Sequence, residues 1–469
     1  MAAPANRLFP ILLGAFFGVA LLKFGNPPIM ERWVGPPANI YEFLLGTPWP
    51  IAWAYWMLAF LTVSGLWLGL SQPSPRPRPR VPSWLLFLPA IWLLWQAVAT
   101  VQSLDGGLSW PTFRHFVACV ACFYLGLFVL SRAESLGGFW TGLLVAFLLV
   151  LVQGWEQHFG GLEATRQFFF REIYPHLKEV PPEYLKKMSS NRIFSTLFYP
   201  NTLAGALLLF LPVLLAVVAE ARELFTLSAR RFLVLAISVG ALGCLYWSGS
   251  KGGWLLLLLL ALIALFQLRF SRSIKIGLVA GLLVFGLAGF IWKYAGFFEK
   301  GATSVSARFD YWEAALKTAM AHPLVGTGPG TFAIPYRELK RPESEMSRMV
   351  HNDYLEQASD SGWFGFIAYA LCIGAGLIVS GRGTLAAFSR TRHPAPSWTR
   401  FCLWLGILGW ALQSLSEFGL YIPALAWPAF TFLGFLLGTT APAAAPASEL
   451  PKGAPSQPQK VIDKSLPHH

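Results

Sequence analysis

A single histidine stands out among the side chains of this sequence that could carry acid–base chemistry. His351 lies in MVHNDYLEQASDSGWFG, residues 349–365, just ahead of a long apolar run. Histidine is the side chain best suited to accept a proton near neutral pH, so His351 is a candidate general base. A lone histidine is more often structural, and from this residue alone that alternative stays open.

The residues that follow His351 favour a helix. With helical spacing, His351, Tyr354, Leu355 and Ala358 share one face, which gives Tyr354 a supporting role beside the histidine. Glu356 and Asp360 then point elsewhere.

A second polar segment is NRIFSTLFYPNTLAG, residues 191–205. The tripeptide Tyr199-Pro200-Asn201 predicts a turn followed by a helix whose N-cap is Asn201. Capping and interfacial anchoring are the alternative to a binding role for Asn201 and Tyr199. Arg192 is a stronger candidate for anion binding, because the orientation assigned below disfavours a basic residue on its side of a membrane.

The third segment, WSGSKGGW at 247–254, is the whole connection between two apolar runs. Its glycines allow a tight turn, and backbone N–H groups of a Gly/Ser turn next to a helix start favour an anion. Lys251 would add a cation there. A phosphate contact and simple snorkelling of Lys251 to the membrane surface are equally compatible with the segment.

The fourth segment is SARFDYWEAALKTAMAHPLVGTGPGTF, residues 306–332. Residues 307–321 predict an amphipathic helix lying on the membrane surface and ended by His322-Pro323, with Arg308, Tyr311, Trp312 and Ala315 on one face. The following GTGPG predicts a loop of special backbone geometry. No strand precedes it, so it is not a nucleotide-binding fingerprint.

The elements that must position these residues are apolar helices. Of the 469 residues, 55% are apolar and only 13% are charged, which indicates a membrane protein rather than a soluble one. We expect an all-α polytopic fold with about twelve transmembrane helices. The candidate spans are 8–24, 50–70, 83–102, 112–130, 138–155, 203–219, 232–247, 254–268, 274–292, 361–380, 401–418 and 422–439.

Basic residues orient these spans. With the N-terminus in the cytoplasm, every internal loop carries Arg or Lys, and an even count of spans returns the C-terminus to the same side. The net charge of +13 is then explained by orientation, and no nucleic-acid partner is expected. Two sizeable loops, 156–202 and 293–360, fall on the external face, so topology brings Arg192, Lys251, Arg308 and His351 to one side.

The chain is predicted to form one transmembrane domain, residues 1–440, followed by a disordered cytoplasmic tail, 441–469, rich in Ala and Pro. A stiff basic link, SQPSPRPRPRVP, occupies 71–82, and a partner for it is open. Cys119 and Cys122 lie within an apolar run and are expected to be small buried residues rather than a redox or metal site.

At these polar segments the sequence resembles the O-antigen ligase/polymerase superfamily. The matching pieces are R-x-F-S-T-L-F-Y-P-N-T-L-A near 192–204, S-K-G at 250–252, R-x-x-Y-W followed by H-P-L-V-G-T-G-P-G-T-F within 308–332, and H-N-D-Y-L-E-Q-A-S-D-S-G at 351–362. Their order and spacing agree with that family. One departure is Lys251, where the family usually has arginine, so the bidentate fork is lost while the charge is kept.

The resemblance implies a GT-C-type fold with a large helical periplasmic loop in a bacterial inner-membrane protein. It implies that His351 is the catalytic histidine and that Arg308 and the cation at 251 bind the diphosphate of an undecaprenyl-diphosphate-linked glycan. We expect Arg192, on the same side of the membrane, to bind the diphosphate with them. Tyr199, Asn201, Tyr311 and Tyr354 would support the site. The implied reaction inverts the anomeric carbon.

The residue types agree with the implied reaction, since attack by an acceptor hydroxyl needs a base and a stabilised diphosphate leaving group. No D-x-D-type acidic pair lies near the cations, so we expect no metal and no cofactor. Asp310 and Asp353 are expected to orient arginines or helix ends instead.

We expect a ligase that transfers glycan to lipid A core. A polymerase and a protein O-oligosaccharyltransferase are the alternatives, because donor motifs do not distinguish acceptors. A transporter or flippase would need ionisable residues near the mid-membrane, whereas Lys23 and Glu417 lie near helix ends. Whether Glu417 reaches the external site is open, as are the sugar and the oligomeric state.

Overall fold

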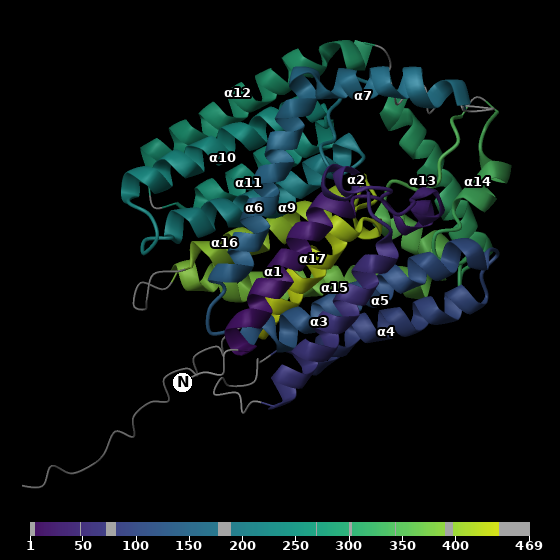
Figure 1. Cartoon of the computed structure of the whole chain (residues 1–469), viewed down its shortest axis with the longest axis horizontal. Coiled ribbons are helices and arrows are strands. Elements are labelled where there is room, and N and C mark those ends of the chain that lie inside the picture. The colour runs from purple at the N-terminus through teal and green to yellow at the C-terminus, as the bar shows by residue number, and fades with distance from the viewer. Residues whose placement is uncertain are drawn as a thin grey trace, which may run out of the picture.

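The computed structural model describes residues 5–46, 48–71, 81–176, 189–268, 270–299, 303–342, 344–389 and 397–439. Throughout these ranges every regular element is a helix, as expected of an all-α polytopic protein (Figure 1). The predictions for the tail at 441–469 and for the basic link at 72–80 concern segments outside the described residues.

All twelve apolar segments form helices. They are α1 (Ala5–Lys23), α3 (Ile51–Ser71), α4 (Ser83–Val101), α5 (Gly106–Phe128), α6 (Gly137–Glu156), α9 (Pro200–Glu220), α10 (Leu227–Ser248), α11 (Lys251–Gln267), α12 (Arg272–Glu299), α15 (Asp353–Ser389), α16 (Trp398–Gln413) and α17 (Pro423–Gly438). Within the described residues, eight helices are long and apolar enough to cross a membrane, while α11 and α17 are apolar but shorter. The prediction of a polytopic membrane protein is thus confirmed, but the count of twelve spans is not.

The bundle has a tightly packed centre. Helices α9 and α17 are buried along most of their length, and α17 lies directly against α5 (Figure 1). Two glycines permit that close approach. A Cβ on Gly126 would lie 2.0 Å from the Thr431 carbonyl oxygen, and one on Gly434 would lie 2.0 Å from the Phe123 carbonyl oxygen. Helix α12, in contrast, is almost entirely unburied.

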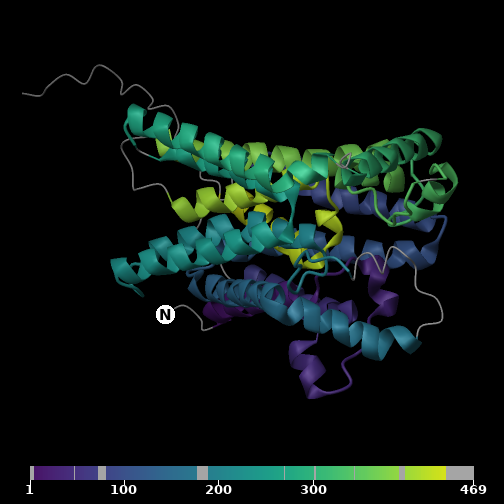
Figure 2. The same ribbon diagram turned by 90° about the horizontal axis from the view of Figure 1, so that it is seen from above.

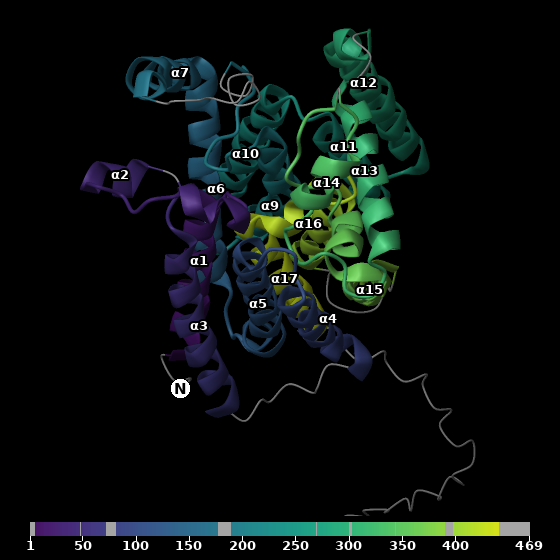
Figure 3. The same cartoon turned by 90° about the vertical axis from the view of Figure 1, so that its right-hand side faces the viewer.

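The helices outside the twelve apolar segments include α13 (Thr303–Ala321), α14 (Ala333–Leu339) and α7 (Leu162–Phe168). Between α12 and α15 the chain forms α13 and α14, which lie at the end opposite the N-terminus (Figure 2). After α6 the chain kinks at Gly160, with a φ of 135°, and turns into α7 (Figure 3). The expected end of the 307–321 helix at His322-Pro323 is confirmed.

Two helix boundaries differ from the predictions in ways that matter for chemistry. Helix α15 begins at Asp353, so His351 precedes the helix instead of sharing its face with Tyr354. Helix α16 ends at Gln413, not at residue 418, so Glu417 lies in the connection 414–422 that leads through η6 (Gly419–Tyr421) to α17.

Candidate functional site

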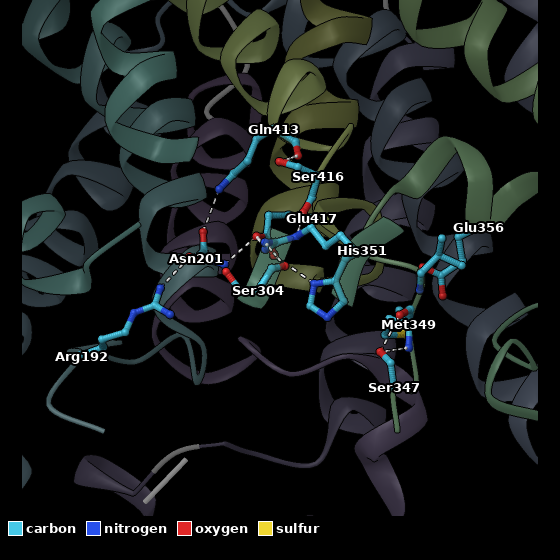
Figure 4. Close-up of polar contacts among 12 residues, drawn as sticks. Arg192, Asn201, Ser304, Ser347, Met349, His351, Glu356, Gln413, Ser416 and Glu417 are labelled. Atoms are coloured by element: carbon cyan, nitrogen blue, oxygen red, sulfur yellow. Dashed lines mark hydrogen bonds and ion pairs between the residues drawn. The ribbon is translucent and has the colours of Figure 1, made fainter. Parts of the chain in front are cut away.

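Glu417 is the centre of a polar cluster built from four separate segments of the chain (Figure 4). Its Oε1 accepts hydrogen bonds from Arg308 Nη2 and, at 2.5 Å, from Asn201 Nδ2. Its Oε2 lies 3.3 Å from His351 Nδ1. The carboxylate therefore joins the predicted base to the predicted diphosphate-binding residues.

Arg192 is the outer member of the cluster and reaches Glu417 through Asn201. Its Nη2 donates to Asn201 Oδ1 at 2.7 Å, and its Nε donates to the Ser248 carbonyl at 2.7 Å. Asn201 was predicted to be an N-cap, and this is wrong. Tyr199 is the cap residue, Pro200 is the first helical residue, and the Asn201 side chain is free to bridge Arg192 and Glu417.

The irregular segment 189–199 that carries Arg192 is fixed by one glutamine. Gln157 Oε1 accepts the backbone N–H groups of Phe194 at 3.0 Å and Ser195 at 2.7 Å, and Gln157 Nε2 donates to the Ser195 carbonyl at 3.0 Å. Ser195 and Phe198 both have positive φ values, 55° and 63°, which ordinary residues rarely adopt. These bonds hold a strained backbone so that Arg192 faces the cluster.

Arg308 is held by a hydrogen bond to the 414–422 connection, which carries Glu417. From α13 its Nε donates to the Ser416 carbonyl at 3.0 Å and its Nη1 to the Ser304 carbonyl at 3.2 Å. The side chains of Arg308 and Glu417 are only 18% and 12% exposed, so this ion pair is shielded from solvent far more than a surface pair.

His351 adopts a backbone conformation that sets its side chain toward Glu417. Its φ of 55° lies in the left-handed region, in which histidine occurs more often than most residues. The ring stacks on Tyr311 with centroids 5.8 Å apart and meets the edge of Phe418 at 4.9 Å. Nδ1 faces Glu417, while Nε2 has no hydrogen-bond partner among the described residues. The side chain is 28% exposed.

The charges of the cluster keep Glu417 ionised. Burial would raise the pKa of its carboxyl, but Arg308, the hydrogen bond and charge of His351, and Arg192 outweigh burial, so the pKa lies below its ordinary value. A carboxylate facing Nδ1 favours the tautomer with the proton on Nδ1, and this leaves the lone pair on Nε2.

Lys251 supplies a further cation. It is the first residue of α11, whose N-cap Ser250 accepts the Gly253 N–H at 3.3 Å, and the preceding Gly249 closes α10 with a φ of 62°. Lys251 Nζ lies 3.8 Å from the centre of the Phe297 ring. Burial, followed by the charges of Arg192 and Arg308, lowers the pKa of Lys251 to about 8. The site thus accumulates more positive charge than Glu417 neutralises.

The connection that carries Glu417 is held by hydrogen bonds to α15 and to α5. Asp353 accepts the Leu420 N–H at 2.7 Å, and the Asp353 N–H donates to the Ser414 carbonyl at 2.8 Å. His115 of α5 contacts the Leu420 carbonyl through Nε2 at 2.7 Å, and its Nδ1 accepts from Trp427 Nε1 at 3.2 Å. Asp353 therefore orients the short helix η6 through Leu420, in line with the expectation that it orients a helix end.

The GTGPG loop has a structural role in this arrangement. Helix α15 is broken at Gly362, which has φ 69° and ψ −176°, and the carbonyls freed at Ser359 and Asp360 accept the N–H groups of Thr327 at 3.0 Å and Gly328 at 2.8 Å. A Cβ on Gly362 would lie 2.1 Å from the Leu324 carbonyl oxygen. The loop thus supplies the backbone hydrogen bonds that α15 loses at its break.

The structure brings together most of the predicted site residues, but not all of them. Arg192, Asn201, Arg308 and His351 join one network, and Lys251 adds its charge to it. Two predicted supporting residues contact the network with their aromatic rings. Tyr311 stacks on His351, and the ring centroids of Tyr199 and Phe418 lie 5.3 Å apart.

Tyr354 is different. Its hydroxyl donates to the Ala411 carbonyl at 3.2 Å, so it fastens α15 to α16 instead of facing His351. Glu356 and Asp360 are both fully buried. Glu356 Oε2 accepts the Val350 N–H at 3.2 Å, and Asp360 Oδ2 accepts the Gly330 N–H at 2.7 Å. Cys119 and Cys122 are buried, as expected.

Sequence reasoning left Glu417 open and missed His115. The available signal for Glu417 was a single acid at the end of an apolar run, in a chain with few acids. In the described part of the chain no group of three His, Cys, Asp or Glu side chains has the arrangement of a metal site. What the arrangement offers is a histidine base held by a carboxylate, next to an excess of positive charge.

Comparison with known proteins gives one family match and one relative. Residues 232–370 match the family model described as O-antigen ligase, a segment that holds Lys251, Arg308 and His351 but not Arg192 or Glu417. An uncharacterised protein of Haemophilus influenzae is 30% identical over an alignment of 165 residues, and the match covers 30% of this chain and 40% of the relative. The chain thus spans less than half the length of that relative. The resemblance to the O-antigen ligase/polymerase superfamily is confirmed over residues 232–370.

Proposed function

We propose that this protein is an inner-membrane glycosyltransferase that moves a glycan from undecaprenyl diphosphate to an acceptor hydroxyl on the periplasmic side. The family match supports a membrane glycosyltransferase of ligase or polymerase type. The observation that carries the proposal is the direct link from His351 through Glu417 to Arg308, because it joins a base to an anion-binding group.

The base in this proposal is His351. Glu417 holds Nδ1, so Nε2 takes the proton of the acceptor hydroxyl as its oxygen attacks the anomeric carbon. Glu417 stabilises the imidazolium that forms and is itself a positioning residue. The new bond forms on the face opposite the diphosphate, the bond from the anomeric carbon to the diphosphate oxygen breaks, and the configuration inverts.

The leaving group is the diphosphate, which departs with the electrons of the broken bond. Lys251, Arg192 and Arg308 stabilise its charge, and they are partly shielded from water, where electrostatic stabilisation is stronger than in bulk solvent. Arg192 and Arg308 already donate to protein carbonyls and to the Asn201–Glu417 pair, so they are oriented before the donor arrives. This scheme uses no metal.

The acceptor is assigned by analogy with the family. We propose lipid A core, the acceptor of a ligase, with a growing lipid-linked glycan or a protein hydroxyl as alternatives. Glycan analysis of a deletion strain separates the three. Unattached but polymerised glycan indicates a ligase, single repeat units indicate a polymerase, and unmodified protein indicates a protein transferase.

The test of the proposal is transfer activity of His351→Ala and Arg308→Ala in cells that lack the native gene. We expect loss of product with normal protein levels, together with accumulation of lipid-linked glycan. Lys317→Gln is a matched control, since Lys317 is 57% exposed on α13 and pairs with Glu313. Normal product from both alanine variants would show that the Glu417 cluster is structural and would refute the transferase.

A further inference from the structure

A second group of cations lies beside the Glu417 cluster, near the C-terminal end of α12. The ammonium groups of Lys251 and Lys293 lie 5.1 Å and 5.8 Å from the centre of the Tyr294 ring. Lys293 Nζ also lies 3.0 Å from the centre of the Tyr246 ring. Within the described ranges neither lysine has a hydrogen-bond acceptor or an acidic partner, so their N–H donors are available to an anion.

Tyr294 adds a neutral donor to these charges. The residue is only 6% exposed, and its hydroxyl is buried with no hydrogen-bond partner in the described structure. A buried hydroxyl without a partner is unfavourable unless something else supplies one. The pKa of Arg192 is lowered, chiefly by burial, while Glu417 and then Tyr294 act in the opposite direction. The Tyr294 phenol is therefore close enough to Arg192 to interact with its charge.

The surroundings indicate an anion with an apolar tail. On α12, the residues next to Lys293 are strongly exposed, with Ile291 at 63% and Trp292 at 76%, and the helix packs mainly on α11. An exposed apolar helix face at the rim of a membrane domain lies against lipid chains. Basic residues are disfavoured on the face to which sequence analysis assigns Lys251 and Lys293, so orientation does not account for them.

We propose that Lys293 and Tyr294, together with Lys251, form a subsite for the lipid-linked phosphate of a polyprenyl diphosphate, with the polyprenyl chain lying along the exposed face of α12. This inference rests on the proposed function. Lys293 and Lys251 contact phosphate oxygens, and the Tyr294 hydroxyl donates to one of them. The glycan then extends toward His351, while α12 holds the lipid end of the donor.

Binding and catalysis can be measured separately on the full chain in nanodiscs. The probes are undecaprenyl diphosphate, undecaprenyl monophosphate and phosphatidylglycerol, each titrated against the wild type and against Lys293→Gln and Tyr294→Phe. Tyr294→Phe removes one oxygen and keeps the ring. Lys317→Gln controls for the loss of a positive charge elsewhere.

We expect Lys293→Gln and Tyr294→Phe each to weaken binding of undecaprenyl diphosphate about tenfold to a hundredfold, as the loss of one charge-assisted hydrogen bond implies. The donor KM should rise by a similar factor, and Lys317→Gln should match the wild type. Unchanged diphosphate affinity in both variants would overturn the subsite. An equal loss of phosphatidylglycerol binding would also overturn it, by showing a general site for lipid headgroups.

The subsite and the proposed function fail in different ways. If the subsite is wrong but the function is right, His351→Ala loses transfer while Lys293→Gln and Tyr294→Phe bind the diphosphate normally. If the function is wrong, His351→Ala keeps normal glycan in cells whatever the α12 variants bind. His351→Ala should itself retain diphosphate affinity, because its ring lies on the Glu417 side of the site.

Discussion

The change Glu417→Gln tests the central contact of the site with the smallest change of shape. The glutamine oxygen can still accept from Arg308 and Asn201, and this places its amide NH₂ where Oε2 now faces His351 Nδ1. An NH₂ group can only donate, so Nδ1 must accept, and the neutral ring then carries its proton on Nε2. That nitrogen can no longer accept a proton from the acceptor hydroxyl.

The expected loss follows from this change of tautomer. General base catalysis contributes about 10²–10⁴-fold, so kcat should fall by that factor, equivalent to about 2.7–5.5 kcal/mol in the activation barrier. Donor KM should change much less, because Arg308 and Arg192 keep their other hydrogen bonds. Loss of the partly exposed ion pair should reduce the free energy of unfolding by about 1–3 kcal/mol, between the values for surface and buried pairs.

The assay is single-turnover transfer from purified lipid-linked glycan, with thermal unfolding measured on the same preparations. Glu313→Gln is the matched control, because Glu313 also pairs with a basic residue, Lys317, but is 51% exposed. A wild-type kcat for well-folded Glu417→Gln would refute the assignment of His351 as a base positioned by Glu417.

Three further predictions use separate parts of the structure. Because the pKa of Lys251 is about 8, its positive charge is lost as pH rises through 8. Donor KM in steady-state kinetics should therefore increase between about pH 7 and 9. Lys251→Arg should flatten that pH dependence, because arginine stays charged over this range. Gly362→Ala forces a Cβ against the Leu324 carbonyl in a backbone region open to glycine, so unfolding in detergent should show a loss of about 2–4 kcal/mol. Tyr354→Phe removes only the bond to Ala411 and should cost about 0.5–1.5 kcal/mol of stability while transfer rates stay near wild type; a large loss of rate would return Tyr354 to the active site.

Hydropathy predicted the twelve apolar helices because each is a continuous apolar run, and the polar segments between the runs contained the residues that the fold brings together. Arg308 and Tyr311 were correctly placed on one face of α13, since helical spacing decides which side chains are neighbours. The predictable part of the site is therefore the part carried by regular elements.

The errors lie where regular structure ends. Asn201 was taken as an N-cap, although a proline is favoured at the first helical position and Pro200 therefore makes Tyr199 the cap. No proline or glycine marks the end of α16 at Gln413, so Glu417 was included in a span. The left-handed backbone of His351 has no local sequence signal either, because the packing of α15 against the 414–422 connection determines it.

The way the 414–422 connection is fastened affects how genetic data on this protein should be interpreted. Leu420 is held by His115 and Asp353, and His115 is held by Trp427, all of them fully buried. A random screen for loss of function should therefore recover substitutions at these buried positions as readily as substitutions at His351. Such alleles would report displacement of Glu417 and would not mark a second reaction centre or a path for substrate through the bundle.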